Sequence, residues 1–253
     1  MSRELASISV IGSRGKMGRA LAHLMEGEFQ SRVRLHLAIH SRSPQEDWLD
    51  ALSSDAWVDF SLPEGIQRIH AVITRALELQ PTARIPALII GTTGHSEADR
   101  NLIQDLEKKT LVLQASNFSL GVLILRKALE FASPMLADSG FKPTLIETHH
   151  IQKKDAPSGT ALTLTHSTRG LSLEKIHSIR AGEVVGDHEV TFHGAGEQVF
   201  FAHYARTRDI FARGALEVAL WLAQKRTFAP AATGNVSLDD FFEEKFKCIT
   251  PSK

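Results

Sequence analysis

The residues best suited to chemistry lie in one segment, residues 147–161, which reads ETHHIQKKDAPSGTA. A histidine can donate or accept a proton near neutral pH, and a nearby lysine supplies positive charge that can hold a carboxylate. His149, His150 and Lys153 therefore make this segment a candidate for proton transfer beside a bound anion. On its own the pattern H-H-x-x-K is weak evidence, because most of the 12 histidines of the chain must be ordinary surface or packed residues.

The end of the same segment predicts an anion site. Pro157, Ser158 and Gly159 form a turn that caps the following helix. Backbone N–H groups near Gly159 and Thr160 would then point at a ligand from the helix N-terminus, where the helix dipole favours negative charge. We expect a carboxylate to bind there.

One constraint applies to the histidine pair. Adjacent residues of a strand face opposite ways, so His149 and His150 can share a pocket only if the strand ends or bends between them.

The sequence predicts no metal site. No acidic or cysteine residue stands at the H-E-x-x-H or C-x-x-C spacing of common metal sites, so we expect no bound metal.

A second candidate site is the glycine loop of residues 12–18. Gly12, Gly15 and Gly18 have the spacing G-x-x-G-x-x-G, and the positions between them are Ser13, Arg14, Lys16 and Met17. A glycine triplet alone can be a plain turn. Here it follows a β-branched run at 7–11 and precedes apolar residues at helical spacing, which is the context of a dinucleotide pyrophosphate site.

The residues after the second expected strand bear on the choice of cofactor. An acidic residue there would bind the ribose hydroxyls of NADH, whereas a cation would bind the additional phosphate of NADPH. The chain has His40, Ser41 and Arg42 at this place, with Arg14 and Lys16 in the glycine loop. These residues favour NADPH, with NADH possible as well, unless Arg42 is only a solvated loop charge.

The hydrophobic pattern predicts the elements that position both sites. Short apolar runs at 7–11, 33–39, 57–60, 87–90 and 110–113 alternate with helical patterns such as 66–79 and 97–108. This alternation predicts an α/β fold, a Rossmann-type doubly wound parallel sheet. Later segments predict an α+β arrangement: a helix at 120–135, a strand at 144–147, a helix at 159–168 and strands between 176 and 204.

We therefore expect two domains. Residues 1–118 with 214–253, where helix returns, would form the dinucleotide-binding domain, and residues 119–213 would form the substrate-binding and oligomerisation domain. A chain of 253 residues can bury a core without disulfides or metals.

Composition limits the partners and the compartment. The 29 basic and 29 acidic residues cancel, so no overall field attracts nucleic acid or an anionic membrane. No apolar run approaches the ~20 residues that a membrane span needs. The single cysteine, Cys248, cannot form an intrachain disulfide, which is typical of a reducing compartment. We expect a cytoplasmic protein that binds neither nucleic acid nor membrane.

The segment from Glu147 to Ala161, E-x-H-H-x-x-K-x-D-A-P-S-G-T-A, resembles the signature of the dihydrodipicolinate reductases. Other motifs fall in the order and spacing of that family: GSRGKMGR at 12–19, DFS and PE at 59–64, GTTG at 91–94, NFS and Gly121 at 117–121, and Arg180, Gly182, Gly186, His188, Gly196, Glu197, His203, Ala205, Arg208, Phe211, Gly214 and Ala215. The resemblance spans nearly the whole chain. Its histidine-lysine segment is highly specific, while many dehydrogenases share the glycine loop.

The resemblance implies a homotetrameric enzyme acting on a small cyclic dicarboxylate. Such an enzyme takes hydroxytetrahydrodipicolinate from the preceding synthase and reduces it with NAD(P)H to tetrahydrodipicolinate, in diaminopimelate and lysine biosynthesis. It implies that His149 is the general acid, that Lys153 is a second proton donor that also holds the substrate, and that His150 binds a substrate carboxylate.

Further binding residues follow from the same resemblance. The other carboxylate would meet the helix N-terminus at Ser158, Gly159 and Thr160. The nicotinamide half of the cofactor would lie along two stretches: Gly91, Thr92 and Thr93, and Ala115, Ser116, Asn117 and Phe118.

The chain departs from the family pattern at two places near the cofactor. His40 stands where many relatives have a glutamate, and this departure disfavours NADH. Leu62 stands where some relatives carry an arginine, which suggests that the phosphate contact is rearranged.

Two alternative functions share only part of these features. Another two-domain NAD(P)-dependent amino-acid or aspartate dehydrogenase would share the cofactor half but would not use His149 and Lys153 in these roles. A non-catalytic NADPH-binding sensor would tolerate the loss of His149. The signature segment weighs against the first alternative, and substitution of His149 tests the second.

Overall fold

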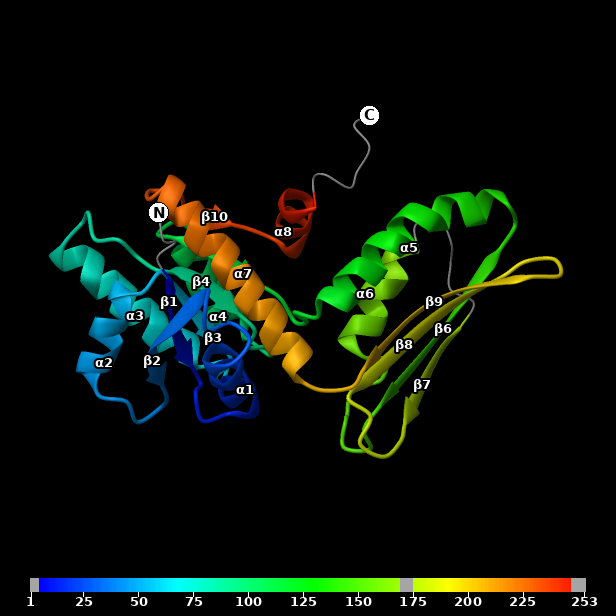
Figure 1. Ribbon diagram of the computed structural model, residues 1–253, viewed down its shortest axis with the longest axis horizontal. Helices are drawn as coiled ribbons and strands as arrows, with labels where there is room; N and C mark the ends of the chain where they lie inside the picture. Colours follow the sequence, from blue (N-terminus) through cyan, green and yellow to red (C-terminus); the bar gives the residue numbers. More distant parts are fainter. Residues whose placement is uncertain (1–4, 169–174, 247–253) are drawn as a thin grey trace. The chain divides into compact units, whose positions relative to one another are not determined.

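The computed structural model describes residues 5–168 and 175–246. These residues form two compact units (Figure 1). The first comprises the described residues up to Phe118 and from Phe211 onward, and the second runs from Ser119 to Ile210. Cys248 lies outside the described residues.

The first unit is built on a six-stranded parallel sheet. Its order is β10-β5-β4-β3-β1-β2, from strands β1 (Ala6–Ile11), β2 (Val33–Ile39), β3 (Ala56–Asp59), β4 (Ala87–Ile90), β5 (Leu111–Gln114) and β10 (Gly234–Asn235). Its helical segments are α1 (Lys16–Glu26), α2 (Gln45–Asp50), the 3-10 turn η1 (Ala51–Ser53), α3 (Gly65–Leu79), α4 (Glu97–Glu107), α7 (Asp209–Phe228) and α8 (Leu238–Lys245). The predicted Rossmann-type fold class is confirmed.

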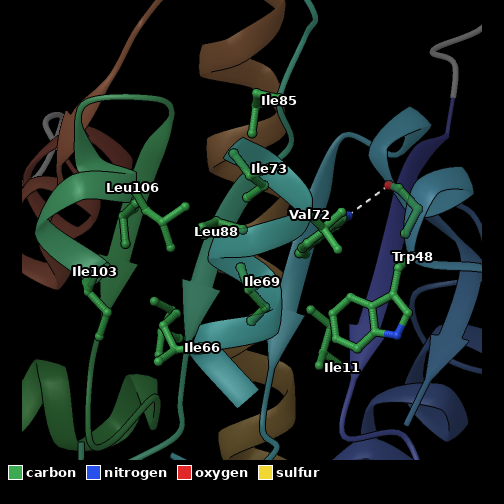
Figure 2. Close-up of a cluster of buried hydrophobic side chains, with 14 of the residues drawn as sticks. Ile11, Trp48, Ile66, Ile69, Val72, Ile73, Ile85, Leu88, Ile103 and Leu106 are labelled. Atoms are coloured by element: carbon green, nitrogen blue, oxygen red, sulfur yellow. Dashed lines mark hydrogen bonds between the residues drawn. The ribbon is translucent and has the colours of Figure 1, made fainter. Parts of the chain in front are cut away.

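Both faces of this sheet are covered, which explains its continuous apolar strands. Every residue of β3 and β4 is buried, as expected of strands with helices on both sides. Helix α3 turns Ile66, Ile69 and Ile73 toward the sheet, at the spacing that places residues on one helical face. Figure 2 shows these side chains packed around Leu88, with Trp48 of α2 beside Ile11 at the end of β1.

The strand order places a crevice at the edge where the glycine loop begins. Strand β1 pairs in parallel with β2 on one side and with β3 on the other. The chain therefore turns in opposite directions after β1 and after β2, and ligands of open α/β sheets bind outside the carboxyl ends of the strands at such a point.

The second unit is a mixed four-stranded sheet with two helices on one face (Figure 1). Its order is β7-β6-β8-β9, from β6 (Lys142–His149), β7 (Ile176–Arg180), β8 (Gly186–His193) and β9 (Gln198–Ala205), and the helices are α5 (Leu120–Asp138) and α6 (Gly159–Ser167). Strand β6 runs parallel to β7 and antiparallel to β8. Alternation along β6 turns Leu145, Glu147 and His149 to the buried face.

Some elements differ from the sequence-based expectation. Helix α7 begins at Asp209 rather than near Gly214, because Gly214 is not a break but a contact point inside the helix. A Cβ atom there would lie 1.7 Å from the carbonyl oxygen of Phe118. Helix α2 and strand β10 were not predicted, since six and two residues are too short to show a periodicity.

None of the helices in the described part of the chain is both long and apolar enough to span a membrane.

Candidate active site

Strand β6 brings a buried carboxylate and a histidine together in the second unit. Glu147 and His149 are two positions apart, so they share one face of the strand. Nδ1 of His149 forms a short hydrogen bond with a carboxylate oxygen of Glu147. Glu147 is fully buried and His149 is 8% exposed. This pair is the centre of the candidate site.

The carboxylate of Glu147 is held in its ionised form by several donors. Nη2 of Arg180 lies 2.9 Å from Oε1 of Glu147, and the backbone N–H of Ser158 donates to the same oxygen at 3.3 Å. Burial is the largest single influence and raises the pKa of Glu147, but the hydrogen bonds from Arg180 and Ser178 and the nearby positive charges outweigh it. The pKa of Glu147 is therefore lowered overall.

This arrangement fixes the tautomer of His149. An ionised carboxylate can only accept hydrogen bonds, so Nδ1 of His149 must carry a proton. The other ring nitrogen, Nε2, then gains or loses the titrating proton. Gly186 leaves room beside it, since a Cβ atom at Gly186 would lie 3.0 Å from that nitrogen. The pair can therefore transfer a proton at Nε2, with Glu147 stabilising the charged ring.

The environment of His149 sets when this proton is available. Burial, the largest influence, lowers the pKa of His149 below its ordinary 6.5, and Glu147 offsets only part of that effect. The positive charges of Lys153 and Arg180 lower it further. Binding of an anion nearby would raise the pKa again, because negative charge favours the imidazolium.

His188 lies beside the pair as a neutral neighbour. Its ring centroid is 5.2 Å from that of His149, in an edge-on arrangement, and its Nε2 is 3.3 Å from Oγ of Ser158. Burial, followed by the charge of His149, lowers the pKa of His188 to about 4. His188 therefore stays uncharged near neutral pH and adds no second positive charge to the interior.

His150 and Lys153 lie on the turn that follows β6. The strand ends at His149, which removes the constraint that adjacent strand residues face opposite ways. The backbone N–H of Lys153 donates to the carbonyl oxygen of His150 at 3.1 Å, and the Lys153 ammonium lies 2.8 Å from Oδ1 of Asp155. Nδ1 of His150 is buried without a partner in the described part of the chain.

The start of α6 completes the polar end of this site. Ser158 is the N-cap, and its Oγ accepts a hydrogen bond from the N–H of Ala161 at 3.1 Å. Gly159 and Thr160 are therefore the first residues of the helix, where N–H groups point along the axis toward an anion. The peptide bond between Ala156 and Pro157 is cis.

Glu147, His149 and His188 are also close enough to hold a metal ion. One nitrogen or oxygen atom from each lies within 4.8 Å of the others. However, both oxygens of Glu147 already accept hydrogen bonds, and the permanent charge of Arg180 stands beside them. The geometry favours a hydrogen-bonded network over a cation site.

The first unit carries the glycine loop in a closely packed form. Gly12 has a φ of +83°, and a Cβ atom there would lie 2.5 Å from the carbonyl oxygen of Phe60. A Cβ atom on Gly18 would lie 2.4 Å from the carbonyl oxygen of Gly12. Helix α1 starts immediately after Gly15, so the loop presents backbone N–H groups at a helix N-terminus. The loop fits a dinucleotide pyrophosphate.

Two cavities lie at the carboxyl ends of the parallel strands. One, of about 420 Å³, is lined by Ile11, Gly12, Arg14, Gly15, His40, Ser41, Trp48, Phe60, Ser61, Leu62, Glu64, Gly65 and Arg68. The other, of about 390 Å³, is lined by Thr92, Thr93, Gly94, His95, Arg100, Gln114, Ala115 and Ser116. Expected cofactor residues thus occur in both cavities.

The remaining expected cofactor residues are not among those that line the two cavities. Ser13, Lys16 and Met17 belong to the glycine loop and the start of α1, and Arg42 is exposed on the loop after β2. Gly91 packs against Phe60, since its Cβ atom would lie 2.1 Å from that ring. Asn117 and Phe118 follow β5, and the ring of Phe118 meets Phe60 at 5.8 Å between centroids.

Sequence reasoning assigned no role to Glu147, Arg180 and His188. The alternation of β6 would have paired Glu147 with His149. Arg180 and His188 reach the site through sheet register, with Arg180 opposite His149 on β7 and His188 opposite Glu147 on β8. No local pattern of the sequence contains that register.

Comparisons with protein families cover most of the chain. A model described as dihydrodipicolinate reductase, N-terminus, matches residues 6–118, and one described as dihydrodipicolinate reductase, C-terminus, matches residues 121–240. A relative from Xanthomonas euvesicatoria named 4-hydroxy-tetrahydrodipicolinate reductase is 37% identical over 238 residues, which cover 89% of this chain and 95% of the relative. One of the same name from Nitratiruptor is 34% identical over 252 residues, covering 87% and 95%.

Solved structures show the same fold at low identity. A dipicolinate-bound dihydrodipicolinate reductase from Paenisporosarcina aligns with a TM-score of 0.64 and 20% identity, over 92% of this chain and 98% of that one. A diaminopimelate dehydrogenase from C. glutamicum aligns with a TM-score of 0.55 and 9% identity, over 94% and 93%.

Proposed function

The chain belongs to the dihydrodipicolinate reductase family and is a nicotinamide-dependent reductase, and we propose that it reduces hydroxytetrahydrodipicolinate to tetrahydrodipicolinate for diaminopimelate and lysine biosynthesis. The observation that carries this proposal is the buried Glu147–His149 pair beside Arg180 and the N-terminus of α6. Such a pair supplies a proton next to the place where Arg180 and the helix N-terminus favour an anionic substrate. The net reaction consumes one hydride and one proton and releases water.

His149 is the proposed general acid. A bound nicotinamide supplies the hydride, and Nε2–H of His149 donates the proton that the reduced ring requires. Glu147 holds Nδ1 and stabilises the imidazolium before transfer. Proton transfer by a positioned side chain typically contributes about 10²- to 10⁴-fold to the rate.

The dicarboxylate is bound by groups around this acid. Lys153 offers an ammonium to one carboxylate and is a second proton donor, and His150 donates to the same end from its ring. The backbone of Gly159 and Thr160 receives the other carboxylate at the N-terminus of α6, with Ser158 fixing that turn.

The first unit is the proposed cofactor domain. The glycine loop holds the pyrophosphate, and the nicotinamide half lies along Gly91–Thr93 and residues 115–118. NADPH is the preferred cofactor and NADH a slower one, since the end of β2 carries His40 rather than an acid. The second unit, with the proposed limits 119–213, binds substrate and makes oligomer contacts. A cytoplasmic location agrees with this biosynthetic role.

Binding of dipicolinate, a stable planar dicarboxylate, tests the substrate site. Lys153→Gln should raise the Kd for dipicolinate by about 10- to 100-fold, because a charge-assisted contact with a carboxylate is lost. Lys154→Gln is the matched control, since the side chain of Lys154 is exposed and its loss should not change dipicolinate binding. Isothermal titration measures both. Equal affinities for wild type and Lys153→Gln would contradict the proposed substrate site.

A homotetramer is the proposed assembly. The face of the second sheet opposite α5 and α6 carries exposed large apolar side chains on three strands: Ile146, Ile179, Phe200 and Tyr204. Burial of this face between copies would remove a patch that monomers rarely leave in water. Light scattering should give four times the mass of one chain, and Phe200→Lys should lower that mass. Phe131→Lys, on α5 away from this sheet face, should not.

A further inference from the structure

Two arginines line the 420 Å³ cavity beside the glycine loop. Arg14 comes from the loop itself, and Arg68 reaches the cavity from the first turns of α3, on the same helical face as Gly65. Glu64 lies on the same lining. Arg42, the cation expected from sequence, is exposed and is not among the lining residues. Leu62 contributes only an apolar wall.

The side chain of Arg68 is held at the end of the second strand. Its Nη2 donates to the carbonyl oxygen of Ser43 at 3.2 Å, and its guanidinium lies 4.7 Å from the centroid of the Trp48 ring. Ser43 closes the turn after β2, since its N–H donates to the carbonyl oxygen of His40 and its Oγ accepts from the His40 N–H. Arg68 is thereby tied to the loop that follows β2.

In dinucleotide-binding folds, the end of the second strand is next to the adenosine half of the cofactor. The ribose of the adenosine half lies at the end of the second strand, and a nearby arginine accommodates a 2′-phosphate. Nη2 of Arg68 is used by Ser43, with Gln45 at 3.5 Å, while no described residue bonds Nε or Nη1. These donors remain for a ligand. A guanidinium presents such donors in a fixed plane that matches phosphate oxygens.

Trp48 supports Arg68 at this place. It is 3% exposed and lines the cavity. Its ring, which Figure 2 shows beside Ile11, is a rigid platform under the Arg68 guanidinium.

We propose that Arg68 recognises the 2′-phosphate of NADPH. The inference rests on the proposed function, in which the first unit binds a nicotinamide dinucleotide. It assigns cofactor preference to a helix residue that no motif marks.

The test is titration calorimetry of the full chain with adenosine 2′,5′-bisphosphate and with 5′-AMP, which differ only in the 2′-phosphate. Wild type should bind the bisphosphate more tightly. Arg68→Gln should weaken bisphosphate binding by about 10- to 100-fold and 5′-AMP binding by less than about threefold. Arg68→Lys should be intermediate, since it keeps the charge but not the planar fork. Arg75→Gln is the matched control, because among the described residues this exposed arginine of α3 pairs only with Glu78.

Each other outcome has a separate meaning. Equal losses for both nucleotides in Arg68→Gln would show that Arg68 supports adenine and would overturn the inference. The inference would also fail if Arg42→Gln removed the preference for the bisphosphate while Arg68→Gln kept it. Retained 5′-AMP binding shows that a variant is folded. A wild-type chain that binds neither nucleotide contradicts the proposed function itself, and the inference falls with it.

Discussion

Substitution of His149 by glutamine should lower kcat by about 10²- to 10⁴-fold, because the general acid is lost while the volume of the side chain is roughly kept. The KM for the dicarboxylate should change much less, since Lys153, His150 and the start of α6 still bind it. Steady-state kinetics with NADPH measures both constants, and circular dichroism checks the fold. A kcat within about twofold of wild type would remove His149 from the chemistry and favour a non-catalytic nucleotide sensor.

The pH dependence of the wild type gives a second measure of the same group. A general acid works only while protonated, so activity is full below the pKa of His149 and is lost as the pH rises through it. In the free enzyme burial lowers that pKa below 6.5, so kcat/KM should already fall in the weakly acidic range. Bound dicarboxylate raises the pKa, so kcat should fall at higher pH than kcat/KM. His149→Gln should abolish this limb of both profiles.

Substitution of Glu147 by glutamine should lower kcat by about 10- to 1,000-fold, although Glu147 touches neither substrate nor cofactor. The amide keeps the shape of the side chain but cannot stabilise the imidazolium, so the pKa of His149 falls further. The basic limb of the kcat profile should therefore move to lower pH, which a merely structural role would not cause. Glu147→Asp should recover part of the activity.

The same substitution should also destabilise the second unit. Glu147 is fully buried, and its removal leaves the guanidinium of Arg180 without its carboxylate, which costs about 3 kcal/mol in a buried pair. Asp138→Asn is a suitable control, because it is also a carboxylate-to-amide change in the second unit and Asp138, the last residue of α5, is exposed. Unchanged kcat, pH profile and urea unfolding in Glu147→Gln would contradict the role given to this residue.

The parallel sheet could be predicted because its strands are continuous apolar runs. β2 and β4 have the expected limits, and the other three predicted strands are shifted by one residue or extended by one. The period of α3 likewise identified the helix that packs on them. Helix α2, which carries Trp48, has only six residues, so its sequence is too short to show a helical period. The predicted start of the last helical region near Gly214 was too late. A glycine that is required by a close contact inside a helix resembles a helix break in the sequence.

The candidate site was predictable only where its residues are neighbours in sequence. His149, His150, Lys153 and Ser158 lie within one segment and are placed together by the end of β6 and the start of α6. Arg180 and His188 depend on the register of β7 and β8, which is set by packing across the sheet. Arg68 depends on the pairing of α3 with the loop after β2, for the same reason.

The most direct test of the proposed reductase is an assay in which the preceding synthase generates the cyclic substrate in place, while oxidation of NADPH and of NADH is followed in parallel. We predict rapid oxidation that requires the synthase and is faster with NADPH. Absence of synthase-dependent oxidation with either cofactor, from a folded protein that still binds NADPH, would contradict the assignment.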